Sequence, residues 1–186
     1  MSMIEKRLRE LGIILPRPPK SIGNFSYGVE IPGMLMVSGT YGTIVDAQDN
    51  DVLPHIGKVG GELTAEAGYQ SARLAAINLL AMAKAVVGDL DRIDRVVRLA
   101  GMVATYPGFQ NAPAIVNGAS DLFVEVLGPV RGRHARIAIP VHELARNAPV
   151  ACEVCFLLRS SSSLVVAQPH VAARAGEPKG RNPGAR

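Results

Sequence analysis

Short apolar segments predict the strands of this chain. Two of them, 25–31 and 34–38, flank Pro32 and Gly33, a turn signal that favours a β-hairpin. Segment 96–105 is rich in apolar and β-branched residues, as expected for a largely buried strand. Two later segments with partly alternating polarity are also predicted to be strands: 133–141 and 149–158. The polar stretch 46–54 is predicted to be a loop.

Two longer apolar stretches between these strands predict helices. The first spans 64–87, where Thr64 is suited to cap the helix start and Gly88 to end it. Alanine recurs along this stretch, and small side chains allow a helix to lie close against a sheet. The second predicted helix, 113–127, is amphipathic and is followed by Gly128.

The order of elements predicts an α+β domain with the arrangement β-β-α-β-α-β-β. Hairpin-like ends and helices between the later strands favour a mixed sheet with both helices on one face. The second face would be aliphatic and uncovered, which favours oligomer formation. Residues 3–11 predict a short helix at the start of the domain, which we place at 1–159. Residues 160–186, rich in Ser, Pro, Gly and basic side chains, predict a largely disordered tail.

Composition makes nucleic acid an improbable partner of the domain. The chain has no Trp and only 4% aromatic residues, so side chains on which bases could stack are scarce. The formal charge is +4, but most of it lies in the tail, which has four basic residues and a single acidic residue, Glu177. The high isoelectric point is therefore mainly a property of 160–186.

Other signals favour a cytoplasmic protein without a metal site. No apolar stretch approaches the roughly 20 residues of a transmembrane helix, and the N-terminus does not have the pattern of a signal peptide. The four His residues show no ligand spacing. Cys152 and Cys155 resemble a redox pair, but residues three apart on a strand point to opposite faces, so we expect core or interface positions.

Two charged residues within predicted strands are candidates for chemistry. Arg136 carries a planar guanidinium that can hold a carboxylate through two parallel hydrogen bonds. Glu153 lies between Cys152 and Val154, where burial would raise its pKa and suit it to proton transfer near neutral pH. The alternative for Arg136 is a surface or interface salt bridge. The alternatives for Glu153 are a structural ion pair with a nearby Arg and a position at an interface.

Five motifs, in order between residues 13 and 158, resemble the RidA (YjgF) family. They are segments 21–29, 36–39, 116–119, 135–138 and 151–154. The resemblance implies a chorismate-mutase-like fold and a homotrimer whose sheets form a central barrel, with sites in the clefts between subunits. It also implies hydrolysis of enamine or imine acids, such as 2-aminoacrylate, to 2-ketoacids and ammonia, with no metal or organic cofactor.

The resemblance assigns roles to individual residues. Arg136 would hold the substrate carboxylate, and Glu153 would orient or activate the attacking water. Four further positions would line the pocket: Ser38, Gly39, Asn117 and Ala138. Phe25 stands where many members have Tyr, and Ala138 where many have Cys, so the exact substrate differs or the activity is altered. Tyr27 is a candidate replacement for the missing hydroxyl.

Two other functions remain open at this point. A non-catalytic trimer would keep Arg136 as a carboxylate anchor without turnover. An RNA-acting protein is the second alternative, because some relatives have been labelled endoribonucleases. A basic tail alone could give salt-sensitive, nonspecific RNA binding.

Overall fold

The computed structural model describes residues 2–159, and the tail predicted for 160–186 lies outside them. Along the chain the elements are α1 (Met3–Glu10), β1 (Gly28–Ile31), β2 (Met34–Tyr41), β3 (Ile44–Val45), β4 (Asp51–Val52), α2 (Ala65–Val87), η1 (Leu90–Arg92), β5 (Ile93–Ala104), α3 (Ala112–Arg131), β6 (Ala135–Val141), η2 (Ala145–Asn147) and β7 (Val150–Leu158). The β3–β4 ribbon occupies part of the segment predicted to be a loop.

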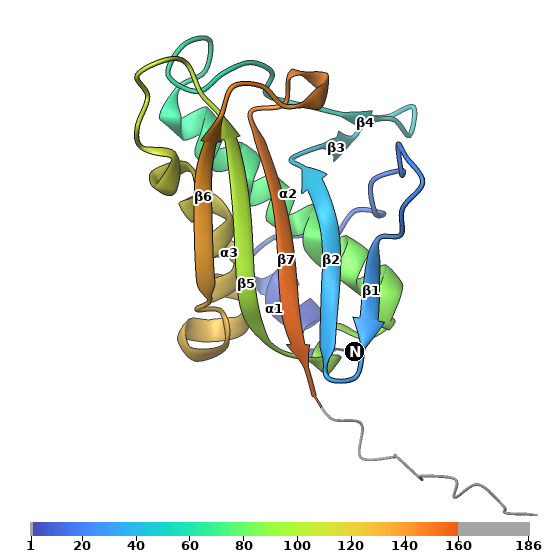
Figure 1. Ribbon diagram of the computed structural model, residues 1–186. Coiled ribbons are helices and arrows are strands. Elements are labelled where there is room, and N and C mark those ends of the chain that lie inside the picture. The colour runs from blue at the N-terminus through green and yellow to red at the C-terminus, as the bar shows by residue number, and fades with distance from the viewer. Residues whose placement is uncertain (1, 160–186) are drawn as a thin grey trace, which may run out of the picture.

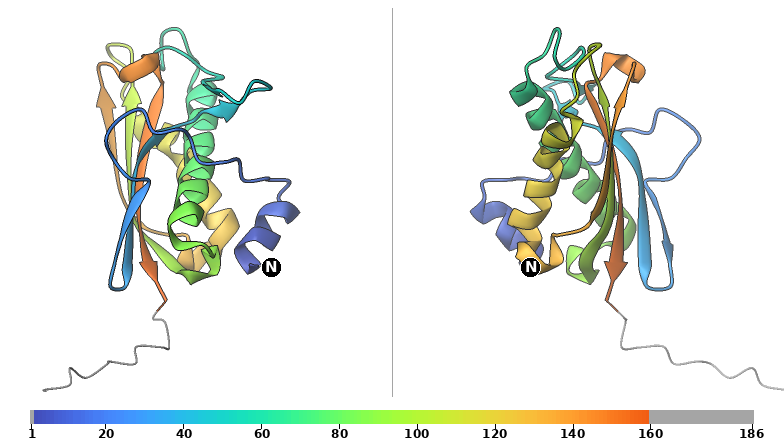
Figure 2. Two further views of the ribbon diagram at one scale, coloured as in Figure 1. Left: turned by 90° about the vertical axis from the view of Figure 1, so that its right-hand side faces the viewer. Right: turned by 60° about the vertical axis from the view of Figure 1, so that its left-hand side comes forward.

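One mixed sheet forms the centre of the molecule, in the order β1-β2-β7-β5-β6. All neighbouring strands are antiparallel except β5 and β6, which are parallel and joined through α3. Both long helices lie on the same side of the sheet, with α1 outside them (Figures 1 and 2). The predicted α+β class, mixed sheet and single helical layer are confirmed.

Local sequence signals set the limits of the long helices. The Thr64 side chain accepts a hydrogen bond from the Ala67 amide at 3.1 Å, and Gly88 ends α2 with a φ of 77°. Gly128, the predicted end of the second helix, is non-helical with a φ of 85°, but one further turn follows it. Where α3 crosses α2, Gly118 lies against the backbone carbonyl of Tyr69 and leaves no room for a side chain.

The core between helices and sheet is aliphatic, as the composition predicts. Leu79, Leu80 and Leu99 are fully buried there, together with the ring pair Phe123 and Phe156. None of the helices within residues 2–159 is both long and apolar enough to cross a bilayer.

The other side of the sheet, which we call the open face, has no helix over it among residues 2–159 (Figure 2). Strand register places a set of exposed apolar side chains on this face. They are Val29, Ile31, Met36, Leu157, Ile137 and Ile139. An apolar surface that extends across a sheet is typical of a contact with another protein surface.

β1 is shorter than the predicted strand 25–31. Its paired register with β2 ends at Gly28 opposite Val37, although the Ser38 amide still donates to the Tyr27 carbonyl at 2.9 Å. Phe25 and Tyr27 therefore lie in the segment before β1 and not on it.

Candidate functional site

A β-bulge places three candidate residues together. On β2, Val37 pairs with Val154 and Thr40 pairs with Cys152, so Ser38 and Gly39 together face the single residue Glu153 of β7. The Ser38 hydroxyl donates to the Ser26 carbonyl at 2.7 Å, which ties the bulge to the segment before β1. Bulges occur often beside active sites, where they redirect side chains.

Glu153 lies on the open face and is not buried. Its neighbours Cys152 and Val154 point into the core, whereas the Glu153 side chain is half exposed and lies 3.5 Å from Arg98. The expectation that Glu153 is buried is therefore wrong for a single copy. An exposed ion pair of this length contributes little stability, so the carboxylate can exchange partners readily.

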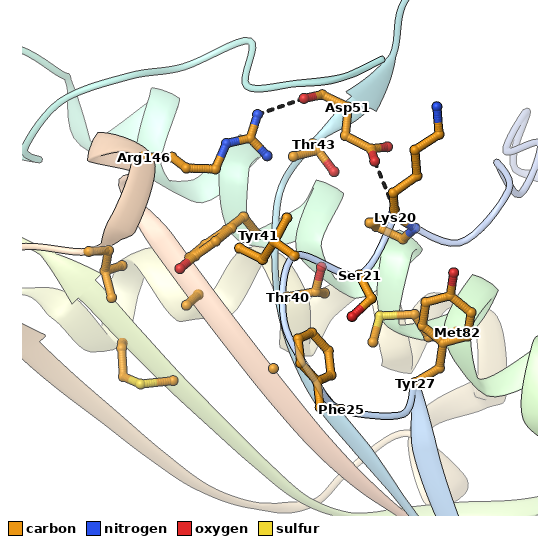
Figure 3. A pocket seen from close by; sticks show the side chains of 16 residues that line it. Lys20, Ser21, Phe25, Tyr27, Thr40, Tyr41, Thr43, Asp51, Met82 and Arg146 are labelled. Carbon is orange, nitrogen blue, oxygen red and sulfur yellow. Dashed lines mark hydrogen bonds between the residues drawn. The ribbon is translucent and has the colours of Figure 1, made fainter. Parts of the chain in front are cut away.

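A pocket of about 330 Å³ opens beside the bulge (Figure 3). Phe25 and Gly39 line it, together with Met102 and Ala151, which pair with each other across β5 and β7. Further apolar or aromatic lining comes from Tyr27, Tyr41 and Met82. We refer to Phe25, Ser38, Gly39 and Glu153 as the bulge group.

The structure does not require glycine at position 39 for the fold itself. Gly39 has no positive φ, and a Cβ atom there would meet its nearest neighbour, the Cys152 carbonyl, at an ordinary 3.9 Å. A side chain would instead occupy space beside the pocket. The glycine therefore leaves backbone accessible, as the sequence prediction assumed.

Arg136 lies at the β6 edge, on the helical side of the sheet. It pairs with the buried Leu99, and its Nη1 donates to Asn117 Oδ1 at 2.7 Å and to Ser120 Oγ at 3.0 Å. No carboxylate within residues 2–159 forms an ion pair with Arg136, although the side chain is exposed. Its Nε and Nη2 donors, the edge that binds a carboxylate in bidentate fashion, make no hydrogen bond within this part of the chain.

His134 continues this network. Its Nδ1 lies 2.6 Å from the Gly132 carbonyl and its Nε2 lies 3.1 Å from Ser120 Oγ. Because a carbonyl only accepts, Nδ1 must donate to Gly132, and the neutral Nε2 then accepts from the Ser120 hydroxyl. The pKa of His134 is lowered, first because the ring is buried and also because Arg136 is positively charged. The hydrogen bond to the Gly132 carbonyl acts in the opposite direction.

The seven predicted site residues thus fall into two groups. Ala138 follows Arg136 by two residues, pairs with Gly101 and lies on the same helical side, so Asn117, Arg136 and Ala138 form what we call the arginine group. The bulge group lies on or beside the open face. Because Arg136 and Glu153 lie on opposite faces, one copy does not bring the two groups together.

The cysteines behave as predicted from strand geometry. Cys152 is buried on the helical side, where burial raises the pKa of its thiol to about 12, and Cys155 is half-buried on the open face. Both are free thiols. Within residues 2–159 no cluster of His, Cys, Asp and Glu is arranged to hold a metal ion.

Sequence reasoning missed two polar residues of these surroundings. Ser120 lies one helical turn from Asn117, a spacing that places both on the same face of α3 and could have indicated it. Arg146 lines the pocket from the loop between β6 and β7, and no sequence pattern marks it. His134, within the predicted strand 133–141, lies just before β6 and contacts Ser120.

The fold is that of an α+β protein with two helices on one face of a mixed sheet, and its candidate residues are divided between the two faces. Residues 5–156 match the family described as "YjgF/chorismate_mutase-like, putative endoribonuclease". The chain therefore belongs to the YjgF/RidA family, as the sequence motifs predicted.

Similar proteins extend the match over most of the chain. "Protein TCP17" of Trypanosoma cruzi is 36% identical over 148 residues, covering 79% of this chain and 89% of that protein. The structure of Atu1372 from Agrobacterium tumefaciens, described as of unknown function, is 35% identical with a TM-score of 0.75, over 84% of this chain and 93% of that one.

A third relative is a Shewanella oneidensis protein described as a "putative endoribonuclease". It is 30% identical with a TM-score of 0.77, over 83% of this chain and 99% of that one. The fold alone is shared with RidA from a Psychrobacter species, which is 18% identical with a TM-score of 0.51, over 76% of this chain and 94% of that one.

Proposed function

We propose that the protein is a metal-independent hydrolytic deaminase of enamine and imine acids, releasing a 2-ketoacid and ammonia. The observation that carries the proposal is the position of the Arg136 guanidinium. Asn117 and Ser120 hold its Nη1, while its Nε and Nη2 edge has no carboxylate partner within residues 2–159. A guanidinium presented in this way suits a small carboxylate ligand. Membership of a family that includes RidA proteins supports the same chemistry.

We further propose that the site forms between copies of a homotrimer. The open face carries the apolar surface that a subunit contact needs, and packing three such faces together gives a central barrel. The arginine group at the β6 edge of one copy then meets the bulge group of the next.

Free thiols at Cys152 and Cys155 suit a reducing compartment, and we propose the cytoplasm.

The proposed reaction requires few groups. Arg136 binds the substrate carboxylate, with Asn117 and Ser120 fixing its orientation. Glu153 takes a proton from water as the oxygen bonds to the imine carbon, and it returns a proton to the nitrogen. As the C–N bond then breaks, the proton of the new hydroxyl passes to the nitrogen, so that ammonia leaves and the carbonyl of the 2-ketoacid forms. An enamine first gains a proton at its terminal carbon and loses one from its nitrogen to become the imine.

The test is release of ammonia and pyruvate from 2-aminoacrylate, generated in situ by a dehydratase acting on serine. We expect wild-type protein to exceed the spontaneous rate and Arg136→Ala to fall to it. Glu153→Gln should lose rate while still binding pyruvate. As a charge-matched control, Arg9→Ala changes α1, on the far side of the helical layer, and should keep the full rate.

Arg136→Ala at full rate, with oligomer and fold intact, contradicts the proposal. Pyruvate binding that depends on Arg136 without turnover of any enamine acid would instead identify a non-catalytic binding trimer. Cleavage of RNA that survives removal of 160–186 would favour the activity named in the description of the Shewanella relative.

A further inference from the structure

Arg146 is held in an uncommon backbone conformation. It lies in η2, between β6 and β7, with φ 64° and ψ 16°, and Asn147 follows with φ 53°. Positive φ is disfavoured for side chains such as arginine and persists only where the surroundings enforce it. Here the Gly57 amide donates to the Asn147 carbonyl at 2.9 Å, which fixes the loop.

The guanidinium of Arg146 is positioned but not neutralised. Its Nη2 donates to the backbone carbonyl of Asp51 at 2.6 Å, and no carboxylate within residues 2–159 forms an ion pair with it. The Asp51 carboxylate is engaged elsewhere, by Arg17 at 2.9 Å and by the Lys20 amide at 2.8 Å. Lys20, the other cation lining the pocket, is paired with Asp49.

Arg146 is therefore the one cation lining the pocket that lacks a counter-charge among the described residues. In Figure 3 it lies above Tyr41, joined to Asp51, while Phe25 lies below. Much of the pocket lining is apolar or aromatic, from residues such as Tyr41, Met102 and Ala151, and the hydroxyl groups of Ser21, Thr40 and Thr43 add neutral polar lining. A pocket of about 330 Å³ has the size of a small-molecule site and is much larger than a three-carbon acid requires.

The pocket continues directly from the proposed reaction site. Ala151 lies on the same face of β7 as Glu153, and two residues of a strand span about 7 Å. Gly39, opposite Glu153 in the bulge, also lines the pocket. A substrate whose reactive carbon lies near Glu153 can therefore extend its side chain along this pocket towards Arg146.

We propose that the pocket binds the side chain of a dicarboxylic substrate, with the distal carboxylate on Arg146 and an aliphatic spacer against the apolar wall. This inference rests on the proposed function, since the α-carboxylate is assigned to Arg136 of a neighbouring copy. A single guanidinium without a counter-charge among the described residues matches one carboxylate, to which its planar fork can donate two hydrogen bonds. The preferred imine acids are accordingly those that yield dicarboxylic 2-ketoacids.

The test measures binding of product ketoacids by calorimetry, in pairs that differ only in the distal group. The pairs are 2-oxoglutarate with 2-oxopentanoate, and 2-oxoadipate with 2-oxohexanoate. We expect the better dicarboxylate to bind roughly 10-fold or more tightly than its partner, the usual effect of a hydrogen bond to a charged group. In Arg146→Gln this preference should disappear while the monocarboxylates bind as before.

Arg9→Gln removes the same charge from α1 and should keep the preference. Equal binding within each pair in the wild-type protein, a preference that survives Arg146→Gln, or no binding of any ketoacid overturns the inference. If 2-aminoacrylate is hydrolysed but no preference is seen, only this inference fails. If the preference is seen and no imine acid is hydrolysed, the proposed function fails and the assignment of Arg146 remains.

Discussion

The charge state of one imidazole affects how Arg136 is held. A neutral His134 accepts from the Ser120 hydroxyl, which orients the Ser120 oxygen to accept from Arg136. Protonation of His134 places a hydrogen on Nε2 and a second positive charge near the guanidinium. The lowered pKa of His134, caused first by burial, keeps the ring neutral at pH 7.

This lowered pKa predicts a pH dependence of stability. Between the ordinary value of 6.5 and the lower folded value, the unfolded chain binds the proton and the folded chain does not. Stability is therefore complete above pH 6.5 and decreases as the pH falls through that window. In His134→Gln this part of the decrease should be absent, as measured by urea unfolding at a series of pH values. Parallel curves for variant and wild type would contradict the assignment.

Substitution of two glycines by alanine should affect stability in different ways. Gly39→Ala should leave the thermal midpoint unchanged within a few degrees, because a Cβ atom meets nothing closer than 3.9 Å, but it should weaken ketoacid binding. Gly118→Ala should cost about 1–3 kcal/mol, because its Cβ collides with the Tyr69 carbonyl where α2 and α3 cross. Thermal unfolding followed by circular dichroism, with calorimetry for binding, checks both. A strongly destabilised Gly39→Ala would show that the bulge needs glycine for folding.

At the scale of elements, α1 depends on a residue distant in the sequence. Asp91 accepts from the Met3 amide at 2.7 Å, from the Ile4 amide at 3.0 Å and from the Ser2 hydroxyl at 2.7 Å. Ile4 and Leu8 bury the inner side of the helix. Burial acts to raise the pKa of Asp91, but the Ile4 and Met3 amides outweigh it, so the pKa is lowered.

Removal of this remote cap should loosen α1. Asp91→Ala should lower the free energy of unfolding by about 1–2 kcal/mol, as for other helix caps. Because the folded pKa is lowered, the contribution is present at neutral pH and disappears only as the pH falls below the ordinary value of 3.8. Asp94→Ala is the control, since that carboxylate makes no hydrogen bond within residues 2–159, and the change should stay within about 0.5 kcal/mol. Equal losses in both variants would refute the capping role.

The sequence predicted the elements well because their limits depend on neighbouring residues. Thr64 and Gly88 act within one turn of the helix ends, so their effects can be inferred without a fold. The bulge opposite Glu153 depends on the register between β2 and β7, strands more than a hundred residues apart in the sequence. Likewise, the positive φ of Arg146 follows from tertiary contacts. Residue identities could therefore be proposed, but not the division of the site between two faces.

At the scale of the whole molecule, the open face predicts assembly. Ile137 and Ile139 lie on it beside Ala100 and Met102 of the neighbouring strand, and both isoleucines are 41% exposed. Burial of such side chains between copies provides the main free energy of association.

Ile137→Glu should therefore prevent assembly. Light scattering after size exclusion should give the mass of three 19.7 kDa chains for the wild type and of one chain for the variant, at micromolar concentration. Ile14→Glu is the control, because Ile14 is 87% exposed and belongs to the segment between α1 and β1, not to a strand of the sheet. A wild-type protein of monomer mass would exclude the shared site, and an unaffected variant would place the contact elsewhere.

The sheet order has a consequence for how the chain is made. β7 is the last strand in the sequence, yet it lies between β2 and β5 and pairs with both. During synthesis the β1–β2 hairpin and the β5–β6 pair emerge first and cannot join until residues 150–158 have left the ribosome. Both pairs expose an unpaired strand edge during that interval, and such edges promote aggregation. Slowing translation ahead of β7 should therefore lower the yield of folded protein more than a similar delay earlier in the chain.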